Sequence, residues 1–339
     1  EAAVGCLLQG PEPASRLVLE YALALRRRGL APATVARRLA TLRSLLGRAR
    51  ELGMVDWSLE LPTPEEVEAA LERSREPGSP YLFPRHPDEV DRLDLQHFAL
   101  HEALGANFLA PVEGPTRVLD VGTGTGQWGF EVAHQLPGAL VVGFDLVRGK
   151  PGAPPRYRHV RGNLLQGLPF QDGVFDFVHQ RFLMAGIPVD AWPGTVAELV
   201  RVTRPGGWVE LVENPPNPTP LGPAGERLFG SIHRLLAAPL GLDTEGVIFR
   251  SLDGYLDRAG LEDVTRREIE LPIGEWGGRV GSFMATNLRA IGARLGEALR
   301  ARSPGAGEEA AELLRGAMEE FERHRTVWPV AILLGRKPA

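Results

Sequence analysis

The chain of 339 residues has one cysteine, Cys6, and two lysines, Lys150 and Lys337. A single cysteine excludes an intrachain disulfide, and one cysteine with scattered histidines shows no metal-ligand spacing, so no metal site is expected. No apolar run approaches the roughly 20 residues of a membrane-spanning helix. The formal net charge of -5 gives no overall signature of nucleic-acid binding. No signal-like segment is recognisable, and we expect a cytoplasmic protein.

The composition is that of an ordinary globular protein, with 43% hydrophobic and 24% charged residues. The length suits one large domain with an appendage. The N-terminal part shows only helical patterns, for example the apolar face that repeats between Val35 and Leu46. The breaker-rich stretch 76–80 then predicts a boundary, with a helical module at 1–78 and a second domain at 79–339.

In the second domain short apolar runs alternate with helical patterns. Each run is bounded by turn residues, as buried parallel strands are. This alternation is typical of a doubly wound, Rossmann-like α/β fold, whose ligands bind beyond the carboxyl ends of the strands. We predict strands at 117–121, 140–144, 157–160, 174–179, 208–213 and 326–334, and helices at 126–135, 192–203, 251–259, 281–299 and 307–324.

The sharpest feature is the segment 118–126, which reads Val-Leu-Asp-Val-Gly-Thr-Gly-Thr-Gly. Glycines let the backbone turn tightly and approach a ligand, and the helix that follows offers free N–H groups near the turn. The segment alone is ambiguous, because residues 124–129 also satisfy the dinucleotide pattern G-x-G-x-x-G and Asp145 lies where its ribose-binding acid should. The acidic Asp120 would repel a pyrophosphate and suits a cationic sulfonium.

Four later segments resemble, in order, the motifs of class I S-adenosylmethionine-dependent methyltransferases. They are 143–146, 162–165, 168–178 and 201–208. The resemblance implies a seven-stranded methyltransferase sheet with S-adenosyl-L-methionine as cofactor. In this family the acid of the second motif accepts hydrogen bonds from both ribose hydroxyls, and an Asp or Asn after the third strand reads the adenine amine. The implied cofactor site consists of Asp120, Gly122, Thr123, Gly124, Asp145, Leu146, Asn163 and Leu164.

A narrower resemblance, to the LaeA-like and TAM-like group of methyltransferases, covers about residues 81–339. It rests on the segments 81–84, 89–97, 175–183, 271–276 and 335–338. In that group the lead-in helix would border the amino-acid end of the cofactor, which implies that Tyr81 and Arg92 lie there. Asn163 departs from the acid common in the group, although an amide can still pair with the adenine edge.

The N-terminal segment 28–53 resembles instead the helical core-binding domain of tyrosine recombinases, without a recombinase's catalytic residues. The resemblance implies DNA as a partner, because phosphate contacts chiefly need clustered positive charge. The alternative, which we favour, is a helical module used for packing or for a homodimer, with its arginines solvated. The arginines in question are Arg37, Arg38, Arg43, Arg48 and Arg50.

Three side chains near the ends of the fourth and fifth strands are candidates for chemistry on the acceptor. Methyl transfer is an in-line displacement that depends largely on positioning, and a base is needed only where the acceptor must lose a proton. We predict His179 as a base or substrate ligand, or alternatively as a hydrogen-bonded core histidine. Arg181 would clamp a carboxylate of the substrate or cofactor. Glu213 would bind a polar or cationic acceptor, or alternatively serve as a structural carboxylate.

The sequence therefore predicts methyl transfer from S-adenosylmethionine to an oxygen or nitrogen of a small-molecule acceptor. One alternative is a DNA-associated regulatory protein whose methyltransferase fold is secondary or inactive, and another is a nucleotide-dependent oxidoreductase. Asn-Pro-Pro-Asn at 214–217 resembles the motif of amino-group methyltransferases acting on adenine and glutamine. It follows the fifth strand rather than the fourth and lacks their aromatic residue, so DNA base methylation is not expected.

Overall fold

The computed structural model describes residues 11–27, 30–51, 55–64, 66–67, 87–150, 152–300 and 306–339. The chain divides into two compact units, Glu1–Ser79 and Pro80–Ala339. In the first unit, helices α2 (Pro11–Arg27) and α3 (Pro32–Glu51) pack against each other. Their shared core contains Ala14, Val18, Ala22, Leu25, Val35, Leu39 and Leu46.

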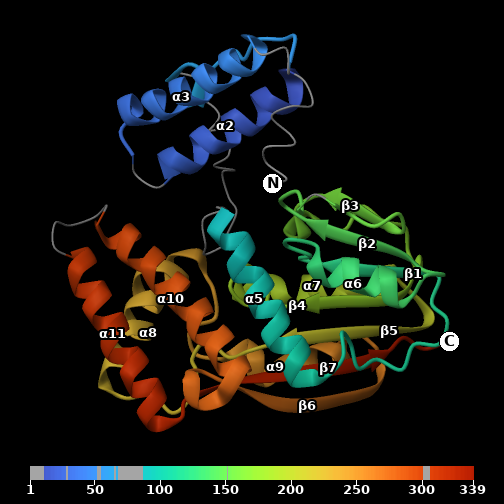
Figure 1. Ribbon diagram of the computed structural model, residues 1–339. Coiled ribbons are helices and arrows are strands. Elements are labelled where there is room, and N and C mark those ends of the chain that lie inside the picture. Colours follow the sequence, from blue (N-terminus) through green and yellow to red (C-terminus); the bar gives the residue numbers. More distant parts are fainter. Residues whose placement is uncertain are drawn as a thin grey trace. The chain divides into compact units, whose positions relative to one another are not determined.

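The second unit is built on a seven-stranded sheet with the order β3-β2-β1-β4-β5-β7-β6 (Figure 1). The first five strands in this order are parallel, and β7 runs antiparallel to both of its neighbours. The predicted doubly wound α/β sheet is confirmed. The strands are β1 (Arg117–Val121), β2 (Leu140–Asp145), β3 (Tyr157–Arg161), β4 (Phe175–Arg181), β5 (Thr203–Glu213), β6 (Glu262–Pro272) and β7 (Val327–Arg336).

Strands β5 and β6 differ most from the predictions. Strand β5, expected at 208–213, begins at Thr203. The helix expected over 192–203 ends at Val202, because Thr203 has the extended backbone with which β5 begins. Strand β6 was not predicted at all. Among the described strands it is an edge strand that pairs with β7 alone, and it exposes most of its charged side chains, so it has no apolar run.

Helices cover both faces and one end of the sheet. Helices α5, α8, α10 and α11 pack on one another beside the ends of β4 and β5. In Figure 1, α8, α10 and α11 lie at the left and α5 near the centre. Among the described residues no helix is both long and apolar enough to cross a membrane. The helices are α5 (Pro87–Leu104), α6 (Gln127–Gln135), α7 (Trp192–Val202), α8 (Pro223–Ile232), α9 (Val247–Arg258), α10 (Gly278–Arg300) and α11 (Ala306–His324), with short turns η1 (Leu164–Gln166), η2 (Val189–Ala191), η3 (His233–Ala237), η4 (Ala238–Leu240) and η5 (Glu275–Gly277).

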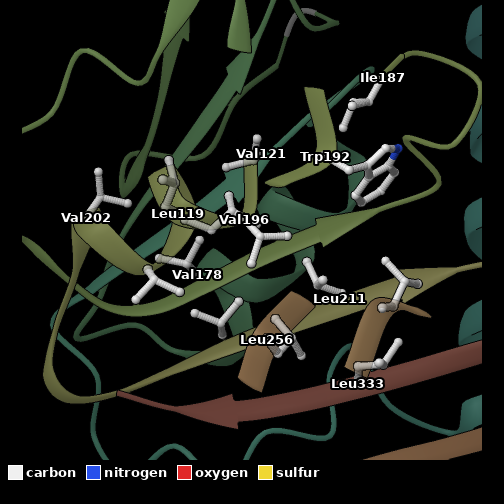
Figure 2. Close-up of a cluster of buried hydrophobic side chains, with 14 of the residues drawn as sticks. Leu119, Val121, Val178, Ile187, Trp192, Val196, Val202, Leu211, Leu256 and Leu333 are labelled. Atoms are coloured by element: carbon white, nitrogen blue, oxygen red, sulfur yellow. The ribbon is translucent and has the colours of Figure 1, made fainter. Parts of the chain in front are cut away.

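The main core lies between the sheet and helices α7 and α9 (Figure 2). Leu119 and Val121 of β1 point into it, together with Trp192 of α7. All three side chains are fully buried, and each contributes roughly 1.5–3 kcal/mol relative to exposure. This packing holds the parallel strands in register, so that their carboxyl ends form one edge where the loops meet.

Candidate active site

The glycine segment predicted from the sequence forms a tight loop between β1 and α6. Gly122, Gly124 and Gly126 have φ angles of 72°, 55° and 86°, a region that side-chain-bearing residues rarely adopt. The N–H groups of Gly122 and Thr123 donate to the carbonyl of Phe144, at 2.8 and 3.1 Å. A Cβ atom on Gly122 would lie 2.5 Å from the Leu183 side chain. The loop therefore presents bare backbone at the carboxyl edge of the sheet.

Asp145 and Asn163 stand at the neighbouring strand ends. The Asp145 carboxylate, half-buried at the end of β2, accepts hydrogen bonds from Gly124 N at 2.8 Å and Val147 N at 3.0 Å. Asn163 follows β3, and its Oδ1 accepts from Leu165 N at 3.0 Å at the start of η1. The structure thus brings the glycine loop, Asp145 and Asn163 to three adjacent strand ends, with Leu146 and Leu164 half-buried beside them.

Asp120 and His179 form a buried pair beneath the loop. Asp120 accepts a hydrogen bond from Thr123 Oγ1 at 2.6 Å, and its other oxygen lies 2.9 Å from Nδ1 of His179. The His179 ring is 1% exposed and stacks on Trp128, with centroids 3.9 Å apart. Burial lowers the pKa of His179. The alternative prediction, a hydrogen-bonded core histidine, describes His179 better than a base or ligand facing an acceptor, because its ring is buried and orients Asp120.

Glu213 also has a structural setting. It is fully buried and accepts hydrogen bonds from Leu183 N at 2.9 Å and Met184 N at 3.3 Å. Burial raises the pKa of Glu213 to about 8. Its carboxyl group fixes the segment that follows β4, and this segment supplies the Leu183 side chain that packs on Gly122. The alternative prediction, a structural carboxylate, describes Glu213 better than an acceptor ligand does.

Arg181 ends β4 and is partly buried beside helix α5. Its Nη2 lies 3.0 Å from Nδ1 of His97, and Nε2 of that histidine lies 2.9 Å from the Glu131 carboxylate. Burial, reinforced by the positive charge of Arg181, lowers the pKa of His97 to about 4. Sequence reasoning missed His97 and Glu131, because a single histidine in a lead-in segment and a single glutamate in a helix form no pattern.

Helix α5 is also tied to the glycine loop. Asp94 accepts a hydrogen bond from Thr125 Oγ1 at 2.7 Å, and its second oxygen lies 2.8 Å from Lys150 Nζ. Sequence reasoning missed Asp94 too, although the near-absence of lysine marked Lys150 as unusual. Arg92, predicted to border the cofactor, is buried and donates to Asn287 Oδ1 on α10 at 2.7 Å. Tyr81 lies outside the described residues.

Two histidines of helix α5 have the sequence spacing of a metal-ligand pair. His97 and His101 stand one turn apart on α5, a spacing that the sequence analysis overlooked, with ring centroids 6.0 Å apart. Within the described ranges, no group of three or more histidine, cysteine, aspartate or glutamate side chains could hold a metal ion.

His233 is half-buried and hydrogen-bonds to the backbone of Pro216.

Comparisons with known proteins identify a methyltransferase domain in this chain. Residues 118–207 match the family described as a methyltransferase domain. The chain is 30% identical over 277 residues to the N-methyltransferase sirN of Leptosphaeria maculans, covering 78% of this chain and 96% of that protein. It is 29% identical over 276 residues to the methyltransferase pytC of Aspergillus terreus, covering 76% and 83%.

A shorter match, 34% identical over 139 residues, relates the chain to the secondary metabolism regulator laeA of Aspergillus fumisynnematus, covering 39% of this chain and 36% of that protein. One solved structure that aligns with this chain is phosphoethanolamine N-methyltransferase 2 of Haemonchus contortus in complex with S-adenosyl-L-methionine. The alignment has a TM-score of 0.44 and 16% sequence identity, and it covers 73% of this chain and 57% of that chain. The resemblance of residues 28–53 to tyrosine recombinases finds no support in these comparisons.

Proposed function

Because this chain belongs to the S-adenosylmethionine-dependent methyltransferases, we propose that it methylates a nitrogen or oxygen of a small-molecule acceptor. The name of sirN, an N-methyltransferase aligned over 96% of its length, favours nitrogen. The observation that carries the proposed cofactor site is the row formed by the glycine loop, Asp145 and Asn163 on adjacent strand ends.

The residues of this row fit the cofactor. Asp145 offers a carboxylate, the acceptor that two neighbouring ribose hydroxyls require, and its bond to Gly124 N fixes its orientation. Asn163 offers a side-chain amide that can pair with the edge of adenine. Leu146 and Leu164 would pack against the base, while the bare backbone from Gly122 to Gly124 would approach the sulfur of the cofactor.

S-adenosylmethionine, when bound, supplies a methyl group on a cationic sulfonium. The chain's residues contribute binding and orientation, which can account for much of the rate of an in-line displacement. Asp120 and His179 hold the glycine loop from below. Glu213 holds the Leu183 segment against Gly122 through backbone hydrogen bonds. In this proposal all three are positioning residues.

Calorimetric titration with S-adenosylhomocysteine tests the cofactor site. The variant Asp145→Asn should weaken binding ~10-fold or more, a loss of about 1.4 kcal/mol. Asp176→Asn is the matched control, because Asp176 also accepts backbone hydrogen bonds, from Thr116 and Arg117, but at the opposite edge of the sheet. The control should bind like the native chain. A folded native chain that binds no S-adenosylhomocysteine would refute the proposal.

A second candidate function, DNA association, has one supporting observation. Helix α3 exposes Arg37, Arg38, Arg43 and Arg50, and clustered exposed arginines suit phosphate contacts. Fluorescence anisotropy of the full chain with a labelled DNA duplex is the test. Binding that weakens steeply with salt would support this candidate, and no binding at low salt would remove it.

A further inference from the structure

Arg181 forms no ion pair with any residue that the structure describes. A guanidinium has five N–H donors. In the described part of the chain the Arg181 side chain forms one hydrogen bond, from Nη2 to Nδ1 of His97 at 3.0 Å. Asp94, Asp120 and Glu131 favour its charge from a distance, but none of them forms an ion pair with it among the described residues. Desolvating a cation is costly unless an anion compensates it. The arrangement therefore suits an anionic ligand.

His97 holds the guanidinium without neutralising it. Because an arginine can only donate, Nδ1 of His97 must be the unprotonated acceptor. The proton of the neutral ring is then on Nε2, which faces Glu131 Oε1 at 2.9 Å. The same oxygen accepts from Gln127 Nε2 at 2.7 Å, which fixes the carboxylate. A carboxylate bound directly to Arg181 would cancel its charge, whereas this neutral histidine orients it and leaves the remaining donors open.

The position of Arg181 along the sheet edge identifies the anion. Val121 pairs with Gln180 across β1 and β4, so Gly122 and Arg181 are the next residues on adjacent parallel strands. The strand order β3-β2-β1-β4 then places Asn163, Asp145, the glycine loop and Arg181 in sequence along one edge. With strands ~4.8 Å apart, this row is about 14 Å long.

S-adenosylmethionine is an elongated molecule with adenine, ribose, sulfur and amino acid in succession. If its nucleoside lies at β3 and β2, as proposed above, its amino-acid end extends past the glycine loop toward β4. We infer that Arg181 binds the α-carboxylate of the cofactor, and that His97 and Glu131 are positioning residues for this contact. The inference rests on the proposed cofactor site. Arg92, the arginine expected at this end from the sequence, instead donates to Asn287.

The test compares two probes, S-adenosylhomocysteine and its decarboxylated analogue, which keeps the nucleoside, thioether and amine and lacks only the carboxylate. Calorimetry on the full native chain should show a preference of ~10-fold or more for the carboxylate-bearing probe, about 1.4 kcal/mol. Arg181→Gln should abolish this preference by weakening only S-adenosylhomocysteine. The matched control is Arg266→Gln, since Arg266 is a partly buried arginine of β6, paired with Glu268; it should keep the preference.

His97 is tested by the same ratio. His97→Phe keeps a planar ring but removes both nitrogens, and it should reduce the preference severalfold. His97→Gln supplies an amide oxygen for Arg181 and an N–H for Glu131, so it should restore part of the preference. A purely structural role for His97 would change the affinities for both probes together and leave their ratio intact.

The outcomes separate the inference from the proposed function. If the native chain binds both probes equally, or if Arg181→Gln weakens both by the same factor, the inference is overturned while the cofactor site stands. Unchanged S-adenosylhomocysteine affinity in Arg181→Gln also overturns it and assigns the guanidinium to another anion, such as a carboxylate of the acceptor. A folded native chain that binds neither probe overturns the proposed function and the inference together.

Discussion

Replacing Glu213 by glutamine should change how stability depends on pH. Burial raises the pKa of Glu213 to about 8, from an ordinary value of 4.5. The folded chain therefore holds a proton at Glu213 that the unfolded chain releases between these two values. Stability from this group is fully present below pH 4.5 and is lost as the pH rises toward 8. Glu213→Gln carries no titrating group, so it should escape this loss.

The size of the effect follows from the two pKa values. One pKa unit corresponds to ~1.4 kcal/mol, so the native chain should lose on the order of 3 to 4 kcal/mol from Glu213 between pH 5 and pH 8. The amide can still accept from Leu183 N, but its NH2 group opposes Met184 N, a mismatch of about 1 kcal/mol that does not depend on pH. The variant should thus be slightly less stable at pH 5 and clearly more stable at pH 8.

Urea unfolding followed by tryptophan fluorescence measures this difference. A Trp57→Phe background in both chains confines the signal to the unit Pro80–Ala339. Glu210, whose pKa burial raises to about 7, is present in both chains, so its contribution cancels in the difference. Equal differences between variant and native chain at pH 5 and pH 8 would refute the burial argument for Glu213.

Three further predictions concern packing and orientation. Gly143→Ala should cost ~1–3 kcal/mol of stability in urea unfolding, because its Cβ would lie 1.9 Å from the Tyr157 hydroxyl; full native stability would contradict the close contact. His179→Phe should weaken S-adenosylhomocysteine binding severalfold, because Asp120 loses its hydrogen-bond partner, and it should leave the pH profile of methyl transfer unchanged. Loss of the acidic limb of that profile in the variant would instead show that His179 acts as a base. Trp192→Ala should cost ~3–5 kcal/mol, and a loss under 1 kcal/mol would show that the site collapses around the gap.

Local sequence was sufficient for the elements whose pattern is short-range. Strand β1 lies at the residues predicted for it, because an apolar run that ends in glycines with positive φ angles is a local pattern of a buried strand and a turn. Strand β6 shows the limit. Its stability comes from pairing with β7, a strand more than fifty residues later in the chain. No pattern within the sequence of β6 predicts that pairing.

The same division holds at the site. The order of glycine loop, Asp145 and Asn163 along the chain predicted their meeting at one edge, because parallel strands align their carboxyl ends. The roles of His179 and Glu213 were not determined in this way. Both follow or end a strand, and only the packing around them decides whether such a side chain faces a ligand or the core.

The sequence by itself therefore determined the family, the parallel sheet and the order of the polar residues at the carboxyl edge of the sheet, since these depend on motifs and local periodicity. The tertiary structure alone decided which polar side chains form hydrogen bonds within the protein and which keep donors or acceptors available to a ligand. It buried Glu213 against backbone N–H groups and His179 against Asp120. It also placed His97 of α5 beside Arg181 of β4, 84 positions apart in the chain. Such contacts arise from packing between segments far apart in the chain, so no local sequence pattern predicts them.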